Sequence, residues 1–539
     1  MVEGIDESLA KITRGAGIIF VGTALGMFLA FFSKVMLVRY ITPSEYGLFS
    51  LGLVFFNIIV AVSRLGLYQG TPRFIAYYRG KKDEGRVREV AYASIIISLS
   101  ASVLFTLCLC LTSNLISTNF IHDQALATPL KIFAIAIPFF TLVNIFSLIF
   151  RGFEKATPNV YFSVLQNVLF LALLFLVIAL SLSFLSIVYA FVASMVLTLL
   201  GCAVYTSRKN PLPQSPSRRG SSTLTRLFKG FWGGSKGDND EGETKSVAKE
   251  LFLFSLPVLG MVILGQIMTW TDTLMLGYFM TSDMVGLYNG AVPIARLLQV
   301  FLGSFAFLYL PLASQFYARN QMEELKRIYQ VITKWIFSAT LPVFLIFLLF
   351  PEAVLNFLFG SSYIEAAPAL RLLALGYFVH AFFGPNGNTL VVIGRPRCVM
   401  WAMLTSVILN IILNISLIPI LGITGAAIAT ATAYILINII IATMLYSISK
   451  IQPFTKNYLK PVAASLIPIA IIYVLVQNFL SPLSLWMLPL LLILFLVVYG
   501  LAVLFTRSFD KEDIAMAQTL EKRLGLNLSA IKRIIIRFI

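Results

Sequence analysis

Apolar residues occur along the chain in long unbroken blocks, separated by shorter polar segments. A helix of about 20 residues rises about 30 Å, which is enough to cross the hydrocarbon core of a bilayer. Lipid offers no partner to backbone N–H and C=O groups, so these blocks must be helical, and a β-barrel would show short alternating segments instead. The pattern predicts an all-α polytopic membrane protein with about 14 transmembrane helices. The expected spans are 15–38, 46–69, 90–112, 130–150, 160–181, 184–205, 250–271, 285–310, 334–351, 370–393, 399–419, 424–446, 460–478 and 483–505.

The composition agrees with a chain that lies mostly in lipid. Of its 539 residues, 58% are hydrophobic and 12% are charged, against about 45–50% and about 25% in soluble domains. A soluble chain needs a polar exterior that this composition cannot supply. The composition therefore excludes a soluble enzyme, a nucleic-acid-binding factor and a disordered scaffold.

Cysteine and histidine are too few for a metal or disulfide framework. The four cysteines lie in or beside apolar blocks and are interpreted as small core residues. His122 and His380 are the only histidines in the sequence, and two cannot build a zinc site. No metal and no cofactor are expected. Glu3, Asp6 and Glu7, followed by an apolar block too long for an h-region, indicate no cleavable signal peptide.

Lysine and arginine are distributed unevenly between the two sides of the membrane. With the N-terminus in the cytoplasm, the segments that face inside hold 35 of the 41 basic residues. Cytoplasmic loops carry such an excess, so both termini are predicted to be cytoplasmic. The net charge of +17 follows from this bias and from attraction to an anionic leaflet, and nucleic acid is not an expected partner.

A polar segment between spans six and seven divides the chain into two comparable parts. It is rich in Gly, Ser, Pro and charge, which is typical of a flexible linker. The expected domains are an N-terminal six-helix lobe (1–205), a cytoplasmic linker (206–249), a C-terminal six-helix lobe (250–446), two additional transmembrane helices (447–505) and a cytoplasmic amphipathic tail (506–539).

The two six-helix parts are related by an internal repeat. A shift of 239 residues places Gly47-Leu48 on Gly286-Leu287 and Pro72 on Pro311. An even number of spans separates the copies, so they have the same orientation, as in a parallel repeat about an axis along the membrane normal. We therefore expect two lobes that face each other across a central cleft.

Span two carries a polar stripe. Ser50, Asn57 and Arg64 are seven residues apart, so they stack along one face of a helix. Arg64 lies nearer the cytoplasmic end, where its side chain can also snorkel to the membrane surface. The stripe predicts that these three residues line the cleft, and the alternative for Arg64 is a structural contact with a carbonyl or a lipid headgroup.

Span eight repeats this stripe. Asn289 and Arg296 are also seven apart, with Gln299 one turn on, and the 239-residue shift places Ser50 on Asn289 and Asn57 on Arg296. Arg296 lies close to mid-membrane, where a charged side chain costs about 2.5–3.5 kcal/mol and usually faces a cavity or a partner. Asn289, Arg296 and Gln299 are therefore predicted to bind substrate in the cleft.

Lys34 and Asp272 form a second candidate pair near the outer ends of spans one and seven. The repeat places Lys34 on Thr273 and Ser33 on Asp272. Opposite charges at nearly equivalent positions favour an outer gate that closes the cleft, and independent snorkelling of the two side chains is the alternative.

Spans eleven and twelve carry the motifs of a known family. They read Asn410-Ile-Ile-Leu-Asn414, then Ile418-Pro419-Ile-Leu-Gly422-Ile-Thr-Gly425-Ala-Ala-Ile-Ala-Thr430, after Gly394-Arg-Pro-Arg397; the first loop reads Tyr40-Ile-Thr-Pro-Ser-Glu-Tyr-Gly-Leu48. Over roughly residues 10–505 the chain resembles the polysaccharide biosynthesis flippases of the multidrug/oligosaccharidyl-lipid/polysaccharide exporter superfamily.

This resemblance implies two six-helix lobes in a V with two extra helices, in the plasma membrane of a prokaryote. It implies that the protein moves a lipid-linked glycan on a polyprenyl-type carrier from the inner to the outer leaflet by alternating access. The protein is expected to function as a monomer, with membrane lipids around it. Members carry cationic residues in the cleft, and Arg64 and Arg296 fit that role by position and type, although the family has no fixed motif at either. Arginine suits a diphosphate because its planar fork grips phosphate oxygens.

Two other functions stay open. A cation-coupled multidrug exporter of the same superfamily usually has twelve spans and acidic groups in its N-terminal lobe, and the middle of that lobe here has neither Asp nor Glu. A polytopic glycosyltransferase or polymerase would need catalytic carboxylates at a membrane face. The coupling ion, Na⁺ or H⁺, is not fixed by the sequence, and Asp272 and His380 are the candidate titrating groups within the membrane.

Overall fold

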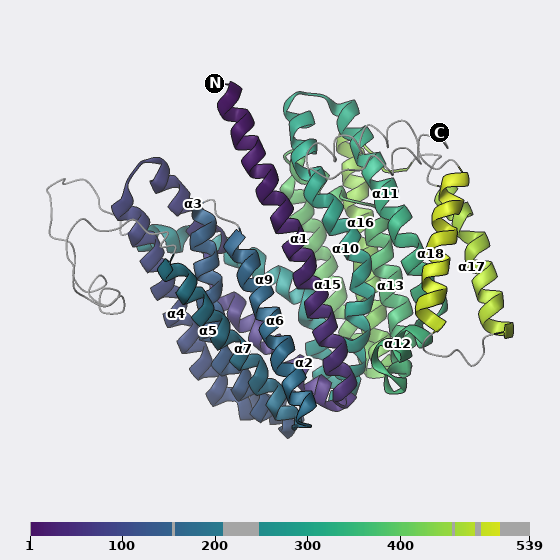
Figure 1. The fold of residues 1–539 in the computed structure, drawn as a ribbon, viewed down its shortest axis with the longest axis horizontal. Coiled ribbons are helices and arrows are strands. Elements are labelled where there is room, and N and C mark those ends of the chain that lie inside the picture. Colours follow the sequence, from purple (N-terminus) through teal and green to yellow (C-terminus); the bar gives the residue numbers. More distant parts are fainter. Residues whose placement is uncertain (1, 154–156, 209–246, 455–458, 480–486, 507–539) are drawn as a thin grey trace. The chain divides into compact units, whose positions relative to one another are not determined.

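The computed structural model describes residues 2–153, 157–208, 247–454, 459–479 and 487–506 (Figure 1). These residues form helices and turns and no strand, which confirms the all-helical prediction. Most of the expected linker (206–249) and nearly all of the expected tail (506–539) lie outside the described residues.

The first half of the chain contains seven α-helices, counted over the described residues. They are α1 (Val2–Tyr40), α2 (Pro43–Ser63), α3 (Leu67–Gly80), α4 (Glu84–Leu115), α5 (Ala127–Gly152), α6 (Thr157–Ala179) and α7 (Phe184–Arg208). A π-helical turn, η1 (Ile116–Phe120), and a 3₁₀ turn, η2 (Gln124–Leu126), connect α4 to α5.

The second half is also helical wherever it is described. Its helices are α9 (Val247–Phe279), α10 (Ser282–Ala318), α11 (Met322–Leu349), α12 (Pro351–Phe359), α13 (Ala367–Phe382), α14 (Asn386–Val392), α15 (Pro396–Leu421), α16 (Ile423–Ser449), α17 (Leu459–Phe479) and α18 (Met487–Phe505), with a 3₁₀ turn, η3 (Ser361–Ala366), before α13.

Eleven helices within the described ranges are long and apolar enough to cross a membrane. Each overlaps one of the expected spans, and the other three expected spans (250–271, 460–478 and 483–505) fall on α9, α17 and α18. The blocks could be read correctly because a lipid-exposed segment must satisfy its own backbone hydrogen bonds.

Two expected spans are interrupted. Span 46–69 breaks at Leu65 and Gly66, whose φ angles are +44° and +74°, and helix α3 follows. Span 370–393 breaks at Gly384, with φ +62°, and Pro385, so that α13 and α14 are separate helices. Positive φ cannot be read from hydropathy, and only the glycines and the proline marked these positions.

The chain divides into two compact units. Unit 1 contains residues 1–17, 34–51 and 267–539, and unit 2 contains residues 18–33 and 52–266. Unit 2 has an apolar core where α3, α4 and α5 meet, around Ile75, Val90 and Ile145. Unit 1 has a larger core around Tyr309, Tyr329 and Leu390, contributed by α10, α11 and α14. Residues 34–51 therefore pack with the second half of the chain although they belong to the first.

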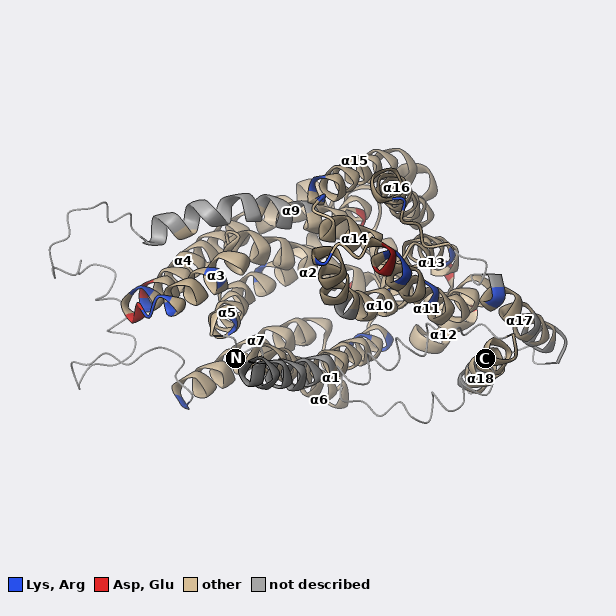
Figure 2. Cartoon of the chain, turned by 90° about the horizontal axis from the view of Figure 1, so that it is seen from above, with Lys and Arg blue, Asp and Glu red and all other residues tan. Residues whose placement is uncertain are grey.

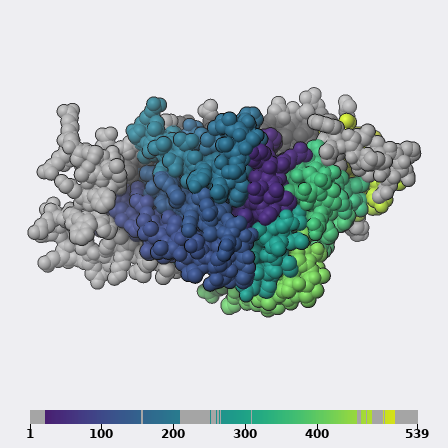
Figure 3. All heavy atoms as spheres, turned by 90° about the horizontal axis from the view of Figure 1, so that it is seen from below, coloured from purple at the N-terminus to yellow at the C-terminus, as the bar shows by residue number. Residues whose placement is uncertain are grey.

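Specific contacts hold residues 34–51 in unit 1. Arg39 donates hydrogen bonds to the carbonyl oxygens of Phe357 and Leu358 at the end of α12, and the Tyr46 hydroxyl donates to the Asn289 carbonyl at 3.3 Å. In Figure 3 the residues of this segment are among the purple ones, and those that follow residue 267 are teal to yellow.

The repeat is visible inside unit 1 as a close backbone crossing. A Cβ atom at Gly47 would lie 1.7 Å from the Ser282 carbonyl oxygen, and one at Gly286 would lie 1.8 Å from the Pro43 carbonyl oxygen. Gly47 and Gly286, and likewise Pro43 and Ser282, are partners under the 239-residue shift. The first turns of α2 and α10 thus cross symmetrically, and only glycine fits at the crossing.

Candidate functional site

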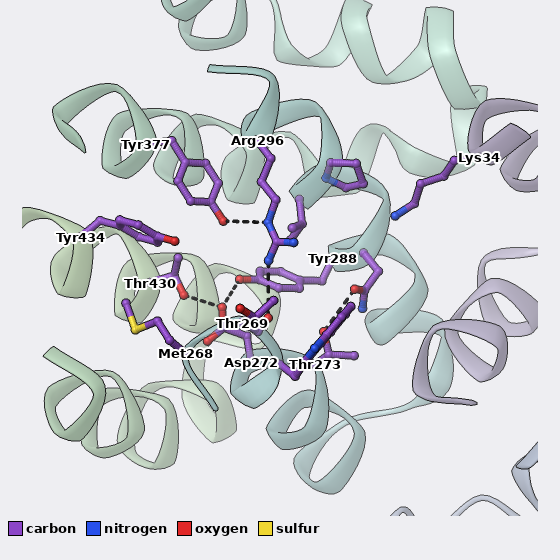
Figure 4. A pocket seen from close by; sticks show the side chains of 14 residues that line it. Lys34, Met268, Thr269, Asp272, Thr273, Tyr288, Arg296, Tyr377, Thr430 and Tyr434 are labelled. Carbon is purple, nitrogen blue, oxygen red and sulfur yellow. Dashed lines mark hydrogen bonds between the residues drawn. The ribbon is translucent and has the colours of Figure 1, made fainter. Parts of the chain in front are cut away.

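A cavity of about 110 Å³ lies within unit 1 and has three charged side chains in its lining (Figure 4). It is formed by the end of α1, by α9 and α10, and by α13 and α16. Its lining residues are Lys34, Met268, Thr269, Trp270, Asp272, Thr273, Tyr288, Asn289, Val292, Pro293, Arg296, Tyr377, Thr430 and Tyr434.

Arg296 extends from α10 into this cavity and is held by neutral groups. Its Nε atom lies 3.5 Å from the Tyr377 hydroxyl, and one terminal nitrogen lies 3.4 Å from the Thr269 carbonyl oxygen (Figure 4). These are long hydrogen bonds for a guanidinium group, which prefers about 2.7–2.9 Å with a charged acceptor. In the described part of the chain no carboxylate lies within ion-pair distance of Arg296. The group keeps its full charge and most of its N–H donors.

Lys34 reaches the same cavity from α1. Its ammonium nitrogen lies 5.6 Å from the centroid of the Tyr46 ring, a cation–π distance. Figure 4 shows Lys34 and Arg296 entering the cavity from different elements. The cavity therefore holds two cationic side chains, neither of which has an ion-pair partner among the described residues.

Asp272 is buried at 7% exposure and is surrounded by neutral donors. One carboxylate oxygen accepts hydrogen bonds from the Tyr288 hydroxyl at 2.6 Å and from the Thr430 hydroxyl. The other accepts from the side-chain amides of Asn414 at 2.8 Å and Asn410 at 3.3 Å. Figure 4 shows Tyr288 and Thr430 turned toward this carboxylate. Four donors from α10, α15 and α16 thus stabilise the charge without neutralising it.

The carboxylate belongs to a small oxygen-rich group. Asn414 also donates to the Asn410 side-chain oxygen at 3.1 Å, and Asn410 donates to the Thr430 hydroxyl at 3.2 Å. The side-chain oxygen of Asn414 is buried and accepts no hydrogen bond from a described residue. Ionisable groups inside a membrane mark ion and proton pathways. A carboxylate with amide and hydroxyl oxygens around it can hold a proton or a small cation.

The described residues contain no group of three or more His, Cys, Asp or Glu side chains that could hold a metal ion. His380 lies next to the cavity residue Tyr434, with ring centroids 5.4 Å apart, and its Nδ1 atom lies 3.1 Å from the Asn438 side-chain oxygen.

Four of the eight residues predicted from the sequence line the cavity: Lys34, Asp272, Asn289 and Arg296. Asn289 accepts from the Thr273 hydroxyl at 3.1 Å and donates to the Val285 carbonyl at 2.9 Å. Lys34 and Asp272 form no ion pair in this structure, and the carboxylate accepts hydrogen bonds from four neutral donors instead. An outer gate between them stays a prediction.

The other four predicted residues do not line this cavity. Ser50 is buried in α2 and Gln299 is half-buried in α10. Asn57 donates to the Leu53 carbonyl at 2.7 Å, and Arg64 donates to the Val60 carbonyl at 3.3 Å. Asn57 and Arg64 belong to unit 2, and their place in a cleft stays a prediction.

The sequence reasoning missed the neutral groups of the site. The sequence does not mark Tyr288, Tyr377 and Trp270, because aromatic residues are common in membrane helices and only their contacts distinguish them. Asn410 and Asn414 belong to the family motif. They stand four residues apart in an apolar helix, so polar residues on one helix face, the pattern that marks Asn57 and Arg64, also mark these two.

Comparison with known proteins places the chain in a family. The model of the family described as polysaccharide biosynthesis protein matches residues 12–317, more than half of the chain, and the MatE model matches residues 257–416.

Two curated relatives illustrate the range of similarity. The chain is 28% identical over 205 residues to the probable low-salt glycan biosynthesis flippase Agl15 of Haloferax volcanii, covering 38% of this chain and 43% of the relative. It is 20% identical over 492 residues to the stage V sporulation protein B of Bacillus subtilis, covering 86% and 88% of the two chains. The chain spans less than half the length of the first two curated relatives that it matches.

Solved structures show the same fold. The lipid II flippase MurJ in an inward closed conformation superposes with a TM-score of 0.66 at 15% identity, covering 91% of this chain and 98% of that chain. An inward-facing multidrug resistance transporter of the MATE family gives 0.63 at 19% identity, covering 80% and 99%. At these identities the likeness concerns the fold alone, whereas the family match rests on sequence, so the chain belongs to the polysaccharide biosynthesis protein family.

Proposed function

We propose that this protein is a flippase that moves a lipid-linked oligosaccharide or polysaccharide precursor from the inner to the outer leaflet, with no enzymatic step. The observation that supports the proposal best is the guanidinium of Arg296 in the cavity of unit 1, which has no ion-pair partner among the described residues. A lipid-linked glycan presents a phosphate or diphosphate between sugar and lipid, and a guanidinium with spare N–H donors suits such an anion.

The charge at Arg296 is not needed for packing. Its partner under the 239-residue shift is Asn57, a neutral residue, so the repeat tolerates an uncharged side chain at this position. Lys34 supplies a second nitrogen donor in the same cavity, which favours an anionic over a neutral cargo. The names of two relatives agree with this cargo: the probable glycan biosynthesis flippase and the putative O-antigen transporter of Shigella flexneri.

The proposal includes the membrane arrangement expected from the sequence. We infer 14 transmembrane helices, two six-helix lobes around a cleft that also includes Ser50, Asn57, Arg64 and Gln299, and alternating access with Lys34 and Asp272 at the outer gate. Both termini lie in the cytoplasm of a prokaryotic cell, the carrier is of the polyprenyl type, and one chain suffices for transport. The distribution of basic residues supports this orientation.

A leaflet-sidedness assay tests the cargo. The purified protein is reconstituted into vesicles with a fluorescent lipid-linked glycan, and an impermeant reagent reports the fraction of headgroups that reaches the other leaflet. Arg296→Ala should slow translocation by about 10- to 100-fold, because a hydrogen bond to a charged group contributes about 1.5–3 kcal/mol. Arg296→Lys should restore only part of the rate, since a point charge lacks the planar fork.

Ser304→Ala is the matched control, because Ser304 lies further along α10, does not line the cavity and donates its hydroxyl to the Val300 carbonyl at 2.8 Å. Equal rates for Arg296→Ala and Ser304→Ala would refute the assignment. Export of cationic dyes without glycan translocation would instead support the multidrug exporter, for which the MatE match to residues 257–416 is the specific observation.

The oxygen-rich group around Asp272 suggests how transport is driven. We propose that Asp272 binds the coupling ion, with Asn410, Asn414 and Thr430 completing the site, because the buried carboxylate has no cationic partner and the Asn414 oxygen has no donor among the described residues. Glycan translocation by the unmodified protein should then depend on a Na⁺ or a H⁺ gradient. Asp272→Asn should abolish that dependence, whereas Asn289→Ala should keep it. A rate that is unaffected by either gradient would refute this part of the proposal.

A further inference from the structure

A separate group of basic and tyrosine side chains covers the exposed face of α3 and the adjacent ends of α4 and α5 in unit 2. We call it the α3 basic surface. It consists of Tyr68, Arg73, Tyr77, Arg79, Lys81, Lys82, Arg86 and Arg151, all of them exposed. Figure 2 shows the blue ribbon gathered where α3 turns into α4.

The surface exists because α3 is strongly amphipathic. One face of this helix is buried against α4 and α5, through residues such as Leu67, Ile75 and Tyr78. The turn at Leu65 and Gly66 separates α3 from the apolar helix α2. The exposed face of α3 carries arginine and tyrosine.

The basic groups are held by aromatic rings. The Lys81 ammonium lies 4.5 Å from the centroid of the Tyr77 ring, and the Arg151 guanidinium lies 5.4 Å from that of Tyr68. Hydrogen bonding to the Tyr77 side chain raises the pKa of Lys81 above its ordinary value, so this group stays charged. Stacking limits the rotamers of long side chains, which reduces the entropy that is lost when they bind an anion.

Acidic residues nearby do not cancel the charge. Arg86 pairs with Asp83 at 3.6 Å, and Glu84 and Glu89 are exposed at the start of α4. Six basic groups stand against these three acidic ones, so the surface keeps a positive excess.

The internal repeat shows that this charge is not a requirement of the fold. Under the 239-residue shift, the positions of Arg73, Arg79, Lys81, Lys82 and Arg86 correspond to Leu312, Ala318, Asn320, Gln321 and Leu325. The second copy thus builds the same helix–turn–helix with uncharged residues at all five positions. The fold of this segment therefore does not require a basic residue at any of these five positions.

We propose that the α3 basic surface binds the phosphate groups of anionic membrane lipids in the cytoplasmic leaflet. The proposal rests on the orientation proposed above and not on the cargo. Tyrosine is enriched at the level of lipid headgroups, where its ring lies in the interface and its hydroxyl reaches water. Lysine and arginine beside such rings meet the phosphates of the leaflet, and each contributes to attraction of anionic lipid.

Lipid binding by the full-length protein tests the proposal. The protein is purified in a neutral detergent, freed of lipid, and titrated with phosphatidylglycerol or phosphatidylcholine, and native mass spectrometry counts the lipids that stay bound. The unmodified protein should retain phosphatidylglycerol in preference. The triple variant Arg79→Gln/Lys81→Gln/Arg151→Gln should bind it at least tenfold more weakly, since each basic group near the surface is worth about fivefold, and its affinity for phosphatidylcholine should not change.

The repeat supplies the control. Arg319→Gln/Lys326→Gln/Arg327→Gln removes three charges from the corresponding segment of the second copy, where Lys326 already pairs with Glu323 at 3.6 Å. This variant should bind phosphatidylglycerol within about twofold of the unmodified protein. An equal loss of phosphatidylglycerol affinity in both triple variants would mean that the overall charge of the protein attracts the lipid, and it would refute binding at the α3 basic surface.

Two further outcomes would also overturn it. One is an unmodified protein without preference for phosphatidylglycerol. The other is displacement of the bound lipid by millimolar inorganic pyrophosphate, which would assign the surface to a soluble phosphate. A fourth variant, Tyr68→Leu/Tyr77→Leu, keeps every charge and should weaken binding about threefold through loss of the stacked rings. Because no transport is measured, the result is independent of the cargo proposed above.

Discussion

The symmetric crossing of α2 and α10 makes a sharp prediction about stability. A Cβ atom at Gly286 would lie 1.8 Å from the Pro43 carbonyl oxygen, and Cβ atoms essentially never approach another heavy atom within 3.0 Å. Gly286→Ala therefore forces the two backbones apart by about 1 Å or more, and overpacking of this kind costs about 1–3 kcal/mol. The same helix offers a control at Gly303, where an added Cβ meets no atom within 4 Å. Gly303→Ala should stabilise the protein by up to about 1 kcal/mol through helix propensity.

The free energy of unfolding in mixed detergent micelles, measured with increasing dodecyl sulfate, gives the difference between the two variants. We expect the free energy of unfolding of Gly286→Ala to lie about 1–4 kcal/mol below that of Gly303→Ala. Gly47→Ala should behave like Gly286→Ala, because a Cβ there would lie 1.7 Å from the Ser282 carbonyl oxygen. The double variant should cost less than the sum, since one separation of the helices relieves both contacts. Equal stability of the Gly286 and Gly303 variants would refute the close crossing.

Three further variants test other parts of unit 1. Trp270→Phe removes a buried indole N–H that has no partner among the described residues, so the free energy of unfolding should change by less than about 1 kcal/mol. Unchanged glycan translocation by this variant would mean that the N–H does not bind cargo. Gly384→Ala places a side chain at φ +62° and within 2.3 Å of the Thr333 hydroxyl, and should destabilise by about 1–3 kcal/mol in the same unfolding measurement. Glu352→Gln breaks a half-exposed ion pair with Arg371 at 2.8 Å, and should cost at most about 1 kcal/mol, less in high salt.

The sequence predicts the fold well wherever lipid leaves the chain no alternative. A block of apolar residues in a membrane must be a helix, so the position of each described span could be inferred from hydropathy alone. The breaks at Gly66 and Gly384 depend on single backbone torsions, which hydropathy does not record. The match of Gly47 with Gly286 was visible in the sequence as a repeat. That these two glycines also touch each other could not be inferred, because a repeat relates positions without stating which of them are in contact.

The site was only half predictable for a related reason. A charge in an apolar helix is conspicuous, so Lys34, Asp272 and Arg296 could be singled out. The groups that decide what those charges do are neutral: the hydroxyl groups of Tyr288 and Thr430 hold Asp272. Nothing in a lone tyrosine or threonine distinguishes a partner of a buried carboxylate from an ordinary core residue.

The neutral partners also explain why opposite charges can share one cavity without pairing. Lys34, Asp272 and Arg296 all line the same 110 Å³ space. A direct ion pair of Asp272 with Lys34 or with Arg296 would cancel the charge that a mobile ion or an anionic cargo could use. Hydroxyl and amide donors reduce the cost of burying Asp272, and the Tyr377 hydroxyl and the Thr269 carbonyl do the same for Arg296, without neutralising either group. This arrangement fits the proposed function, in which the carboxylate binds a cation, the guanidinium binds a phosphate, and transport couples the two.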